Sequence, residues 1–283
     1  MQHRVLWVHG IGAHSAGYSA GWQTHFNEYL KLNPTDYVEV CWNNVFEAAH
    51  ETRSVDGSGD PLALTPQEQL AANEVRQDLE TMLQARSWVL QAAPEAATTR
   101  GGNSIVEYSQ LQHEATTRGS LDWVFNPNEY LGDFVKYLVS RNVRNAVKEQ
   151  AKEHLRSLAT TNTSISIIAH SWGTVVAYDS LLDLEVEVPT LQVAHLFTLG
   201  SPLWLVRRML EDRSGRKPGQ LANWINIHAR GDLVGSWLQP AFRVDKDFAV
   251  PNVGSAGAHS SYFVANNQAV QSDIIAQHML SST

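Results

Sequence analysis

The sequence predicts an α/β fold that is interrupted by one long insertion. Short apolar runs with the length of buried strands alternate with longer stretches whose apolar residues recur at helical spacing. This alternation stops after a strand candidate at residues 37–42 and resumes near residue 127. We therefore expect residues 1–42 and 127–283 to form an α/β core, and residues 43–126 to form a cap-like insertion.

The composition and charge are those of a globular protein. Of the 283 residues, 43% are hydrophobic and 18% are charged, which is an ordinary balance. The formal net charge of −8, with no long basic block, argues against a nucleic-acid partner and against strong attraction to anionic membranes. No apolar run approaches the roughly 20 residues of a membrane-spanning helix, and no secretory pattern precedes the first strand. We expect a cytoplasmic protein, with export by another route left open.

The N-terminal segment supplies the first two strands of the core. Residues 4–10 form a short apolar run that ends in a glycine-rich turn, and a helix candidate containing Trp22 and Phe26 follows. The second strand candidate, residues 37–42, contains the only cysteine, Cys41. A single cysteine excludes an intrachain disulfide and a zinc site built from several thiolates. We interpret Cys41 as a buried structural thiol.

The insertion, residues 43–126, contains one clear helix. Thr65, Pro66 and Glu68 form a helix start with an N-cap, a proline in the first turn and a capping box. Apolar residues then recur at near-helical spacing to about Gln91. A helix with loose loops suits a cap over an active site. A structural side lobe or a partner-binding surface fits the same pattern, so these alternatives stay open.

After the insertion the core pattern resumes. A second capping sequence at Asn126 leads into one long helix or two successive helices. Residues 193–199 and 223–228 have the character of further buried strands, and an irregular loop then runs to Ala258. The chain closes with an amphipathic helix. Its inward residues are expected to be Val270, Ile274 and Ile275.

One stretch, residues 164–176, combines an apolar strand, a sharp turn and a helix. The turn reads Ala-His-Ser-Trp-Gly at residues 169–173. Such a turn holds its serine in a strained backbone conformation, so that the hydroxyl stands clear of the sheet. The small residues at its two ends are needed where the strand and the helix cross closely. We predict that Ser171 is a nucleophile; the alternative is a buried strand followed by a capped helix.

At these residues the sequence resembles the α/β-hydrolase superfamily, in its lipase and esterase-like branch. The usual elbow of that family is G-x-S-x-G, and Ala169 stands here in place of the first glycine. A Thr-Leu-Gly-Ser-Pro strand end, found at residues 198–202, is frequent in the resembled proteins. The resemblance implies a mostly parallel, doubly wound sheet of the α/β-hydrolase type, with no cofactor and no metal.

The resemblance also implies an oxyanion hole, which binds the negative charge that develops on a substrate carbonyl. In the family, a strand ending in His-Gly supplies one backbone N–H donor. That donor would be Ile11 or Gly12 here, after His9 and Gly10, and Trp172 would supply the other. The alternative is a plain strand-to-helix turn. The spacing matches neither G-x-G-x-x-G nor the P-loop, which disfavours phosphate binding.

A serine nucleophile needs a base, and the base needs an orienting acid. The family's chain order is serine, then aspartate or glutamate, then histidine. Here Asp232 follows a strand end and His259 precedes the last helix. We predict Ser171 as nucleophile, His259 as general base and then acid, and Asp232 as holder of the imidazole tautomer. Asp245 and Asp247, in the loop before His259, are substitutes for the acid if that loop folds back.

The substrate is less determined than the reaction. Trp204 and Trp237 follow strand ends, where side chains can line an acyl pocket, although both can equally pack in the core. We expect a carboxylic ester with a lipid or other hydrophobic acyl group. The alternatives are an amidase or peptidase of the same fold, a non-catalytic binding module, and a toxin-like phospholipase delivered to another cell. The oligomeric state is left undetermined.

Overall fold

Six parallel strands form one sheet. The computed structural model describes residues 2–10, 14–48, 60, 62–92, 130–159, 163–254 and 257–281, with the backbone alone at residues 91, 92, 130 and 131. The strands are β1 (Gln2–Val8), β2 (Tyr37–Val40), β3 (Thr163–His170), β4 (Val193–Leu199), β5 (Leu221–Ala229) and β6 (Lys246–Val250). Their order across the sheet is β2-β1-β3-β4-β5-β6, and every neighbouring pair is parallel.

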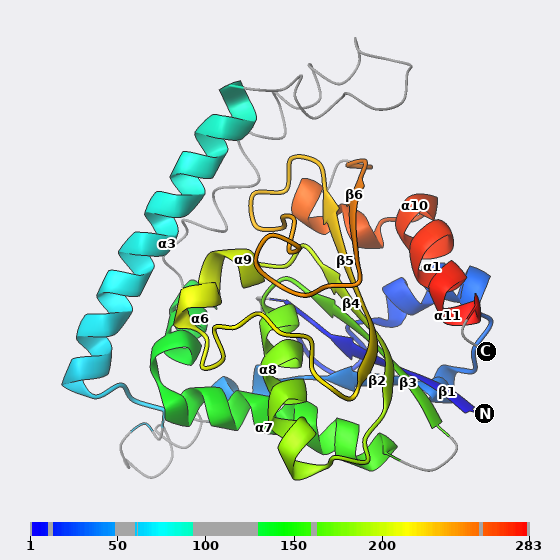
Figure 1. Cartoon of the computed structure of the whole chain (residues 1–283), viewed down its shortest axis with the longest axis horizontal. Coiled ribbons are helices and arrows are strands. Elements are labelled where there is room, and N and C mark those ends of the chain that lie inside the picture. The colour runs from blue at the N-terminus through cyan, green and yellow to red at the C-terminus, as the bar shows by residue number, and fades with distance from the viewer. Residues whose placement is uncertain are drawn as a thin grey trace.

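Helices connect and cover the strands, so that the predicted α/β class is confirmed (Figure 1). They are α1 (Ala20–Leu30), α3 (Pro66–Ala92), α6 (Tyr130–Val139), α7 (Arg141–Leu158), α8 (Trp172–Glu187), α9 (Leu203–Val206), α10 (Gln268–Val270) and α11 (Gln277–Ser281). Short 3₁₀ turns are η1 (Pro34–Asp36), η2 (Arg207–Met209) and η3 (Ala258–Phe263), and a π-helical turn, η4 (Gln271–Ala276), joins α10 to α11.

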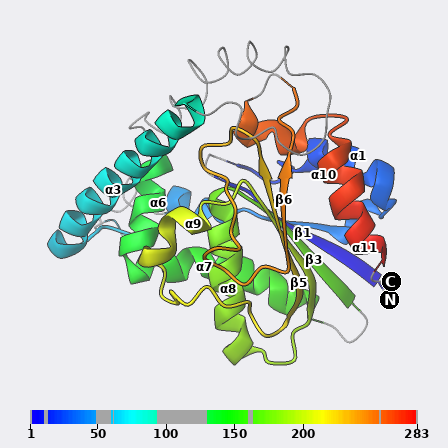
Figure 2. The ribbon, with the colours of Figure 1, turned by 45° about the horizontal axis from the view of Figure 1, so that its top comes forward.

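The sheet separates two apolar cores. Successive side chains of a strand point to opposite faces, and in β1 Leu6 and Val8 enter one core while Val5 and Trp7 enter the other. The first core contains residues of α3, α6, α7 and α8, and the second contains residues of α1 and the C-terminal helices. Figure 2 shows these two groups of helices on opposite sides of the sheet. Coverage on both faces explains why the strands have nearly continuous apolar runs.

The chain reverses its direction across the sheet beside β1. It passes from β1 through α1 to the edge strand β2, then returns to β3 on the other side of β1 and continues outward to β6. Val8 pairs with Ala169, so β1 and β3 end side by side. Ligand sites of open α/β sheets form beyond the carboxyl ends of the strands at such a reversal. The predicted elbow lies at this point.

The predicted helix of the insertion is α3. The backbone N–H of Thr65 donates to Glu68 Oε2 at 2.8 Å, and the N–H of Glu68 donates to Thr65 Oγ1 at 3.2 Å. These two bonds are the capping box read from the sequence. α3 is a single long helix, and it packs against α6 (Figure 1). Most of the remaining insertion and the helix start at Asn126 lie outside the described residues.

Two further features refine the predictions. The segment expected to be an irregular loop before Ala258 contains the strand β6, so that part of the prediction is wrong. As an edge strand with charged residues in its sequence, Lys-Asp-Phe-Ala-Val, β6 lacks the apolar run of an inner strand. Ser140 adopts an extended conformation between α6 and α7, so the region is two helices.

None of the helices in the described ranges combines the length and apolarity needed to cross a membrane.

Candidate active site

Ser171 lies in the sharp turn between β3 and α8. Its φ of 53° and ψ of −131° are strained for any residue other than glycine. The turn is held by the backbone, because the N–H of Ser171 donates to the carbonyl of Leu199 at 2.9 Å. A Cβ atom on Gly173 would lie 2.2 Å from the carbonyl oxygen of His9. The close crossing that the sequence predicted is therefore present, and it requires glycine at residue 173.

The structure joins the three predicted residues by hydrogen bonds. His259, in η3, places Nε2 at 2.9 Å from Ser171 Oγ. Its Nδ1 lies 3.0 Å from each carboxylate oxygen of Asp232, which follows β5. An ionised carboxylate can only accept hydrogen bonds, so Nδ1 carries the proton and Nε2 of the neutral ring accepts from the serine hydroxyl. This arrangement can remove a proton from Ser171.

Asp232 lies in the loop of residues 230–236 and is only 1% exposed. Its Oδ2 accepts from the hydroxyl of Tyr262 at 2.6 Å, and its Oδ1 accepts from the N–H of Val234 at 2.9 Å. Burial by itself raises the pKa of Asp232, but the charge of His259 and the hydrogen bonds from His259 and Tyr262 together lower it below its ordinary value. The carboxylate is therefore ionised at neutral pH.

Glycines leave room for the side chains of Asp232 and His259. Gly200, at the end of β4, has a φ of 58°, and a Cβ there would lie 3.0 Å from Asp232 Oδ2 and 3.1 Å from His259 Cε1. A Cβ on Gly235 would lie 2.6 Å from the same carboxylate oxygen. The glycine in the Thr-Leu-Gly-Ser-Pro strand end thus has a physical function that the sequence pattern did not reveal.

Of the predicted oxyanion-hole residues, Ile11 and Gly12 lie outside the described residues. Trp172 is the first residue of α8, directly after Ser171. The first N–H groups of a helix have no acceptor within the helix and carry its positive dipole end. The indole of Trp172 is buried against Trp42 and Phe134, at ring distances of 4.2 and 4.9 Å. Its side chain therefore packs in the core, which leaves its backbone N–H for the predicted function.

The two tryptophans predicted to line an acyl pocket lie on or beside loop 230–236. Trp204 donates its indole N–H to the carbonyl of Val234 at 2.6 Å. Trp237 is 49% exposed and packs edge-on against His228. Trp204 therefore holds the loop in place, and a contact of either ring with substrate stays a prediction.

The alternative acids have other partners. Asp247 Oδ2 accepts from the N–H of Leu238 at 2.6 Å. Asp245 accepts from Lys217 at 2.9 Å. The carboxylate bonded to His259 is that of Asp232. Within the described ranges, no group of three or more His, Cys, Asp or Glu side chains is arranged to hold a metal ion.

His170, which precedes Ser171, is hydrogen-bonded to the backbone of His259. Its Nε2 donates to the carbonyl oxygen of His259 at 2.8 Å. Burial and the neighbouring charge of His259 lower the pKa of His170 to about 3. It is therefore neutral at physiological pH.

Sequence reasoning missed two residues that act on Asp232. The hydroxyl of Tyr262 donates to its carboxylate and accepts from the N–H of Ala229 at 2.8 Å. Arg86, on α3 of the insertion, donates to the carbonyl oxygens of Asp232 and Gly235 at 3.0 and 2.7 Å. The only sequence signal for Tyr262 is its position three residues after His259 in a helical turn, and Arg86 has the appearance of a solvated helix residue.

Comparisons with known proteins add little to this geometry. No family model matches the chain, and no curated protein matches it. Among solved structures, an uncharacterized protein from Pseudomonas aeruginosa is similar, with 10% sequence identity and a TM-score of 0.31. The match covers 98% of this chain and 45% of that chain, so this chain spans less than half the length of that protein. A functional assignment therefore depends on the site itself.

Proposed function

We propose that the protein is a serine hydrolase that cleaves a carboxylic ester through an acyl-enzyme. The observation that carries the proposal is the hydrogen-bonded chain from Asp232 through His259 to Ser171, with contacts of 3.0 and 2.9 Å. Nucleophile, base and orienting acid are recognised by this geometry on unrelated folds. The strained turn and the position at the reversal of the sheet also agree with the resemblance to α/β-hydrolases.

The first half of the reaction forms the acyl-enzyme. Ser171 Oγ attacks the carbonyl carbon of the ester while its proton moves to Nε2 of His259, and Asp232 stabilises the resulting imidazolium. The oxyanion of the tetrahedral intermediate accepts from the backbone N–H of Trp172. The intermediate then collapses, the bond to the alcohol oxygen breaks, and His259 returns the proton to the leaving alcohol.

The second half releases the acid. Water enters after the alcohol leaves and gives a proton to His259 as its oxygen attacks the acyl carbon. The second tetrahedral intermediate collapses with cleavage of the bond to Ser171 Oγ, and His259 returns the proton to the serine. The products are one alcohol and one carboxylic acid, and the three side chains regain their initial protonation states.

The proposed substrate is a lipid ester or another ester with a hydrophobic acyl group. We test it with a p-nitrophenyl ester series from acetyl to long acyl chains. Wild type is expected to hydrolyse at least one of these esters, and Ser171→Ala is expected to lower kcat by about 10³-fold or more. The chain-length optimum then reports the size of the acyl site.

A matched control is Ser180→Ala. Ser180 is buried on the same helix, α8, and its hydroxyl lies 3.4 Å from the carbonyl of Lys148. Its removal is expected to leave the ester rate within about twofold. A folded wild type that hydrolyses no ester but reacts with a fluorophosphonate at Ser171 would favour an amide substrate. A folded wild type that fails both tests would replace the proposal with a non-catalytic binding module.

A further inference from the structure

Arg86 joins the insertion to the loop that carries Asp232. Its Nη2 donates to the carbonyl oxygens of Asp232 and Gly235 at 3.0 and 2.7 Å, and its Nη1 donates to Ser236 Oγ at 2.9 Å. One side chain of α3 thus holds three residues of loop 230–236. A guanidinium group presents several N–H donors in a fixed plane, so it restricts position and orientation together.

A second side chain holds the same loop from another element. Trp204, on α9, donates to the carbonyl of Val234 at 2.6 Å. The guanidinium of Arg86 lies over the Trp204 ring at 4.8 Å from its centroid, where a cation is attracted to the ring face. Arg86 and Trp204 therefore form one clamp on the backbone of the loop, which we call the Arg86–Trp204 clamp.

The charge of Arg86 has an unusual environment. Its hydrogen-bond acceptors are two carbonyls and one hydroxyl, and within the described ranges no carboxylate lies at ion-pair distance from it. Burying a cation is costly unless hydrogen bonds compensate for the lost water. Burial lowers the pKa of Arg86, while the negative charge of Asp232 opposes this shift. The charge of Arg86 thus interacts favourably with the carboxylate of Asp232.

We propose that Arg86 is a positioning residue for Asp232, and that α3 of the insertion is a working part of the site and not only a cover over it. This inference rests on the proposed hydrolase function. With α3 docked, the clamp holds the backbone of loop 230–236, and the carboxylate stays in contact with Nδ1 of His259. When Arg86 is absent, the loop keeps its sequence but loses three hydrogen bonds, and the carboxylate drifts from the base.

The test compares Arg86→Met and Arg86→Lys with Arg76→Met. Arg76 lies on the same helix and has no hydrogen-bond partner among the described residues, so its substitution is a matched control. Arg86→Met is expected to lower kcat for the ester by about 10- to 100-fold with KM changed less than about threefold, because a small displacement of a catalytic group has an effect of this size. Arg86→Lys, which cannot donate in a fork, is expected to fall between Arg86→Met and wild type.

Chemical rescue separates positioning from a loss of folding. Added guanidinium at millimolar, non-denaturing concentration is expected to restore part of the activity of Arg86→Ala and to leave Arg76→Ala unchanged. Thermal unfolding of each variant shows whether it is folded at the assay temperature. A folded Arg86→Met with the kcat of wild type would overturn the inference, as would an Arg86→Ala variant that loses kcat but is not rescued.

A spectroscopic measurement tests the inference without any substrate. The proton on Nδ1 of His259, hydrogen-bonded to Asp232, is expected to give a downfield NMR resonance that is absent in His259→Gln. Arg86→Met is expected to weaken or broaden this resonance, and Arg76→Met is expected to retain it. An unchanged resonance in Arg86→Met would overturn the inference. If the proposed function fails because wild type is inactive, this result still decides whether Arg86 positions Asp232.

Discussion

Two buried aspartates of this protein have the same kind of neighbour and opposite pKa shifts. Asp232 and Asp179 are 1% and 4% exposed, and each accepts a hydrogen bond from a tyrosine hydroxyl, at 2.6 Å from Tyr262 and at 2.8 Å from Tyr137. Burial raises the pKa of Asp179 to about 6. The pKa of Asp232 is instead held below its ordinary value.

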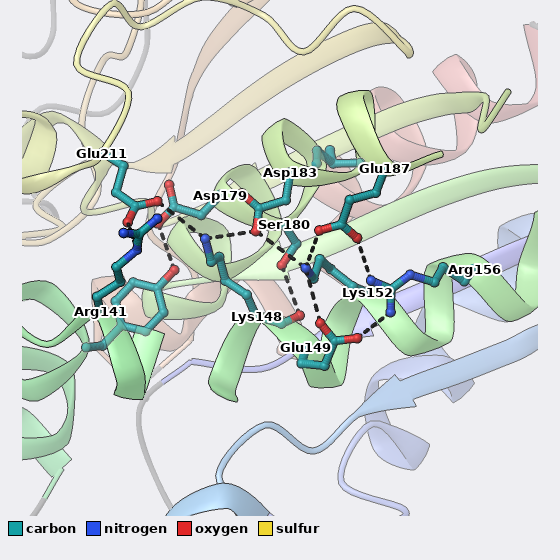
Figure 3. A network of polar contacts seen from close by, with 12 residues as sticks. Arg141, Lys148, Glu149, Lys152, Arg156, Asp179, Ser180, Asp183, Glu187 and Glu211 are labelled. Atoms are coloured by element: carbon teal, nitrogen blue, oxygen red, sulfur yellow. Dashed lines mark hydrogen bonds and ion pairs between the residues drawn. The ribbon is translucent and has the colours of Figure 1, made fainter. Parts of the chain in front are cut away.

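The number of direct donors explains the difference. Asp232 accepts from His259 on both oxygens and from a backbone N–H in addition to its tyrosine. Asp179 has its tyrosine and lies beside Lys148, whose Nζ is 2.9 Å from Asp183 and 3.5 Å from Glu211 (Figure 3). The charges of Arg144 and Lys148 both act on Asp179, but Lys148 is paired with those two carboxylates and Arg144 Nη1 lies 3.6 Å from Glu211. A buried carboxylate is charged when donors touch it, and burial alone does not predict its state.

The largest expected effect separates the two aspartates by activity. Asp232→Asn is expected to lower kcat for the ester by about 10⁴-fold, because the amide cannot hold the tautomer of His259 that accepts a proton from Ser171. Asp179→Asn is expected to change kcat by less than about threefold. Steady-state kinetics of both variants with one ester checks this. Equal losses in the two variants would mean that Asp179 also contributes to the reaction, and the comparison would lose its basis.

The next effect is the pH dependence of stability. The folded pKa of Asp179, about 6, lies above the ordinary value of 3.8, so the folded state binds more protons than the unfolded state between these values. Its contribution to the free energy of unfolding therefore falls as the pH rises from about 4 to 6. The amide of Asp179→Asn does not titrate, so this variant does not lose that stability. The free energy of unfolding of Asp179→Asn, compared with that of wild type, is therefore expected to rise by on the order of 2 kcal/mol from pH 4 to pH 7.

Urea unfolding of both proteins across this pH range measures the difference. Asp232 has the opposite sign, because its folded pKa is lowered. Its stabilising contribution is present above about pH 4 and is lost as the pH falls further. A difference between Asp179→Asn and wild type that does not vary with pH would contradict the raised pKa of Asp179.

The smallest expected effect compares the two tyrosines. Tyr262→Phe removes a donor from Asp232 and an acceptor from the N–H of Ala229, and is expected to lower kcat by about tenfold and stability by about 1–3 kcal/mol. Tyr137→Phe is expected to destabilise by a similar amount through Asp179 and to leave kcat within about twofold. Kinetics and urea unfolding of both variants separate these outcomes. A loss of kcat in Tyr137→Phe would show that the two carboxylates are coupled.

Local patterns predicted most of the fold and the three residues of the Ser–His–Asp chain. Ser171 was predictable because its strand, turn and helix are contiguous in the sequence. Asp232 and His259 followed from the order implied by the resemblance, and the structure connects them to Ser171 by hydrogen bonds. The strand β6 was missed because an edge strand needs no continuous apolar run.

The supporting residues of the site were not predictable for a physical reason. Arg86 reaches Asp232 across 146 positions of sequence, and no local pattern encodes which loop a helix will meet. Tyr262 is recognisable only when its hydroxyl is seen between Asp232 and the end of β5. Sequence patterns thus indicated the residues proposed to react, while the groups that tune their charge and position depend on packing between distant segments.

The pairing of β1 with β3 has a consequence for how the chain folds during synthesis. Gln2 pairs with Thr163 and Val8 with Ala169, so the centre of the sheet closes a loop that contains the whole insertion. Closure entropy grows only logarithmically with loop length, about 0.6 kcal/mol for each doubling, and the insertion adds little to it. The insertion does, however, delay the synthesis of β3. At about 5–20 residues per second, β3 follows β1 by roughly 8 to 30 s. Until then β1 can pair only with β2, and the backbone N–H and C=O groups of its other edge stay open to pairing with other chains.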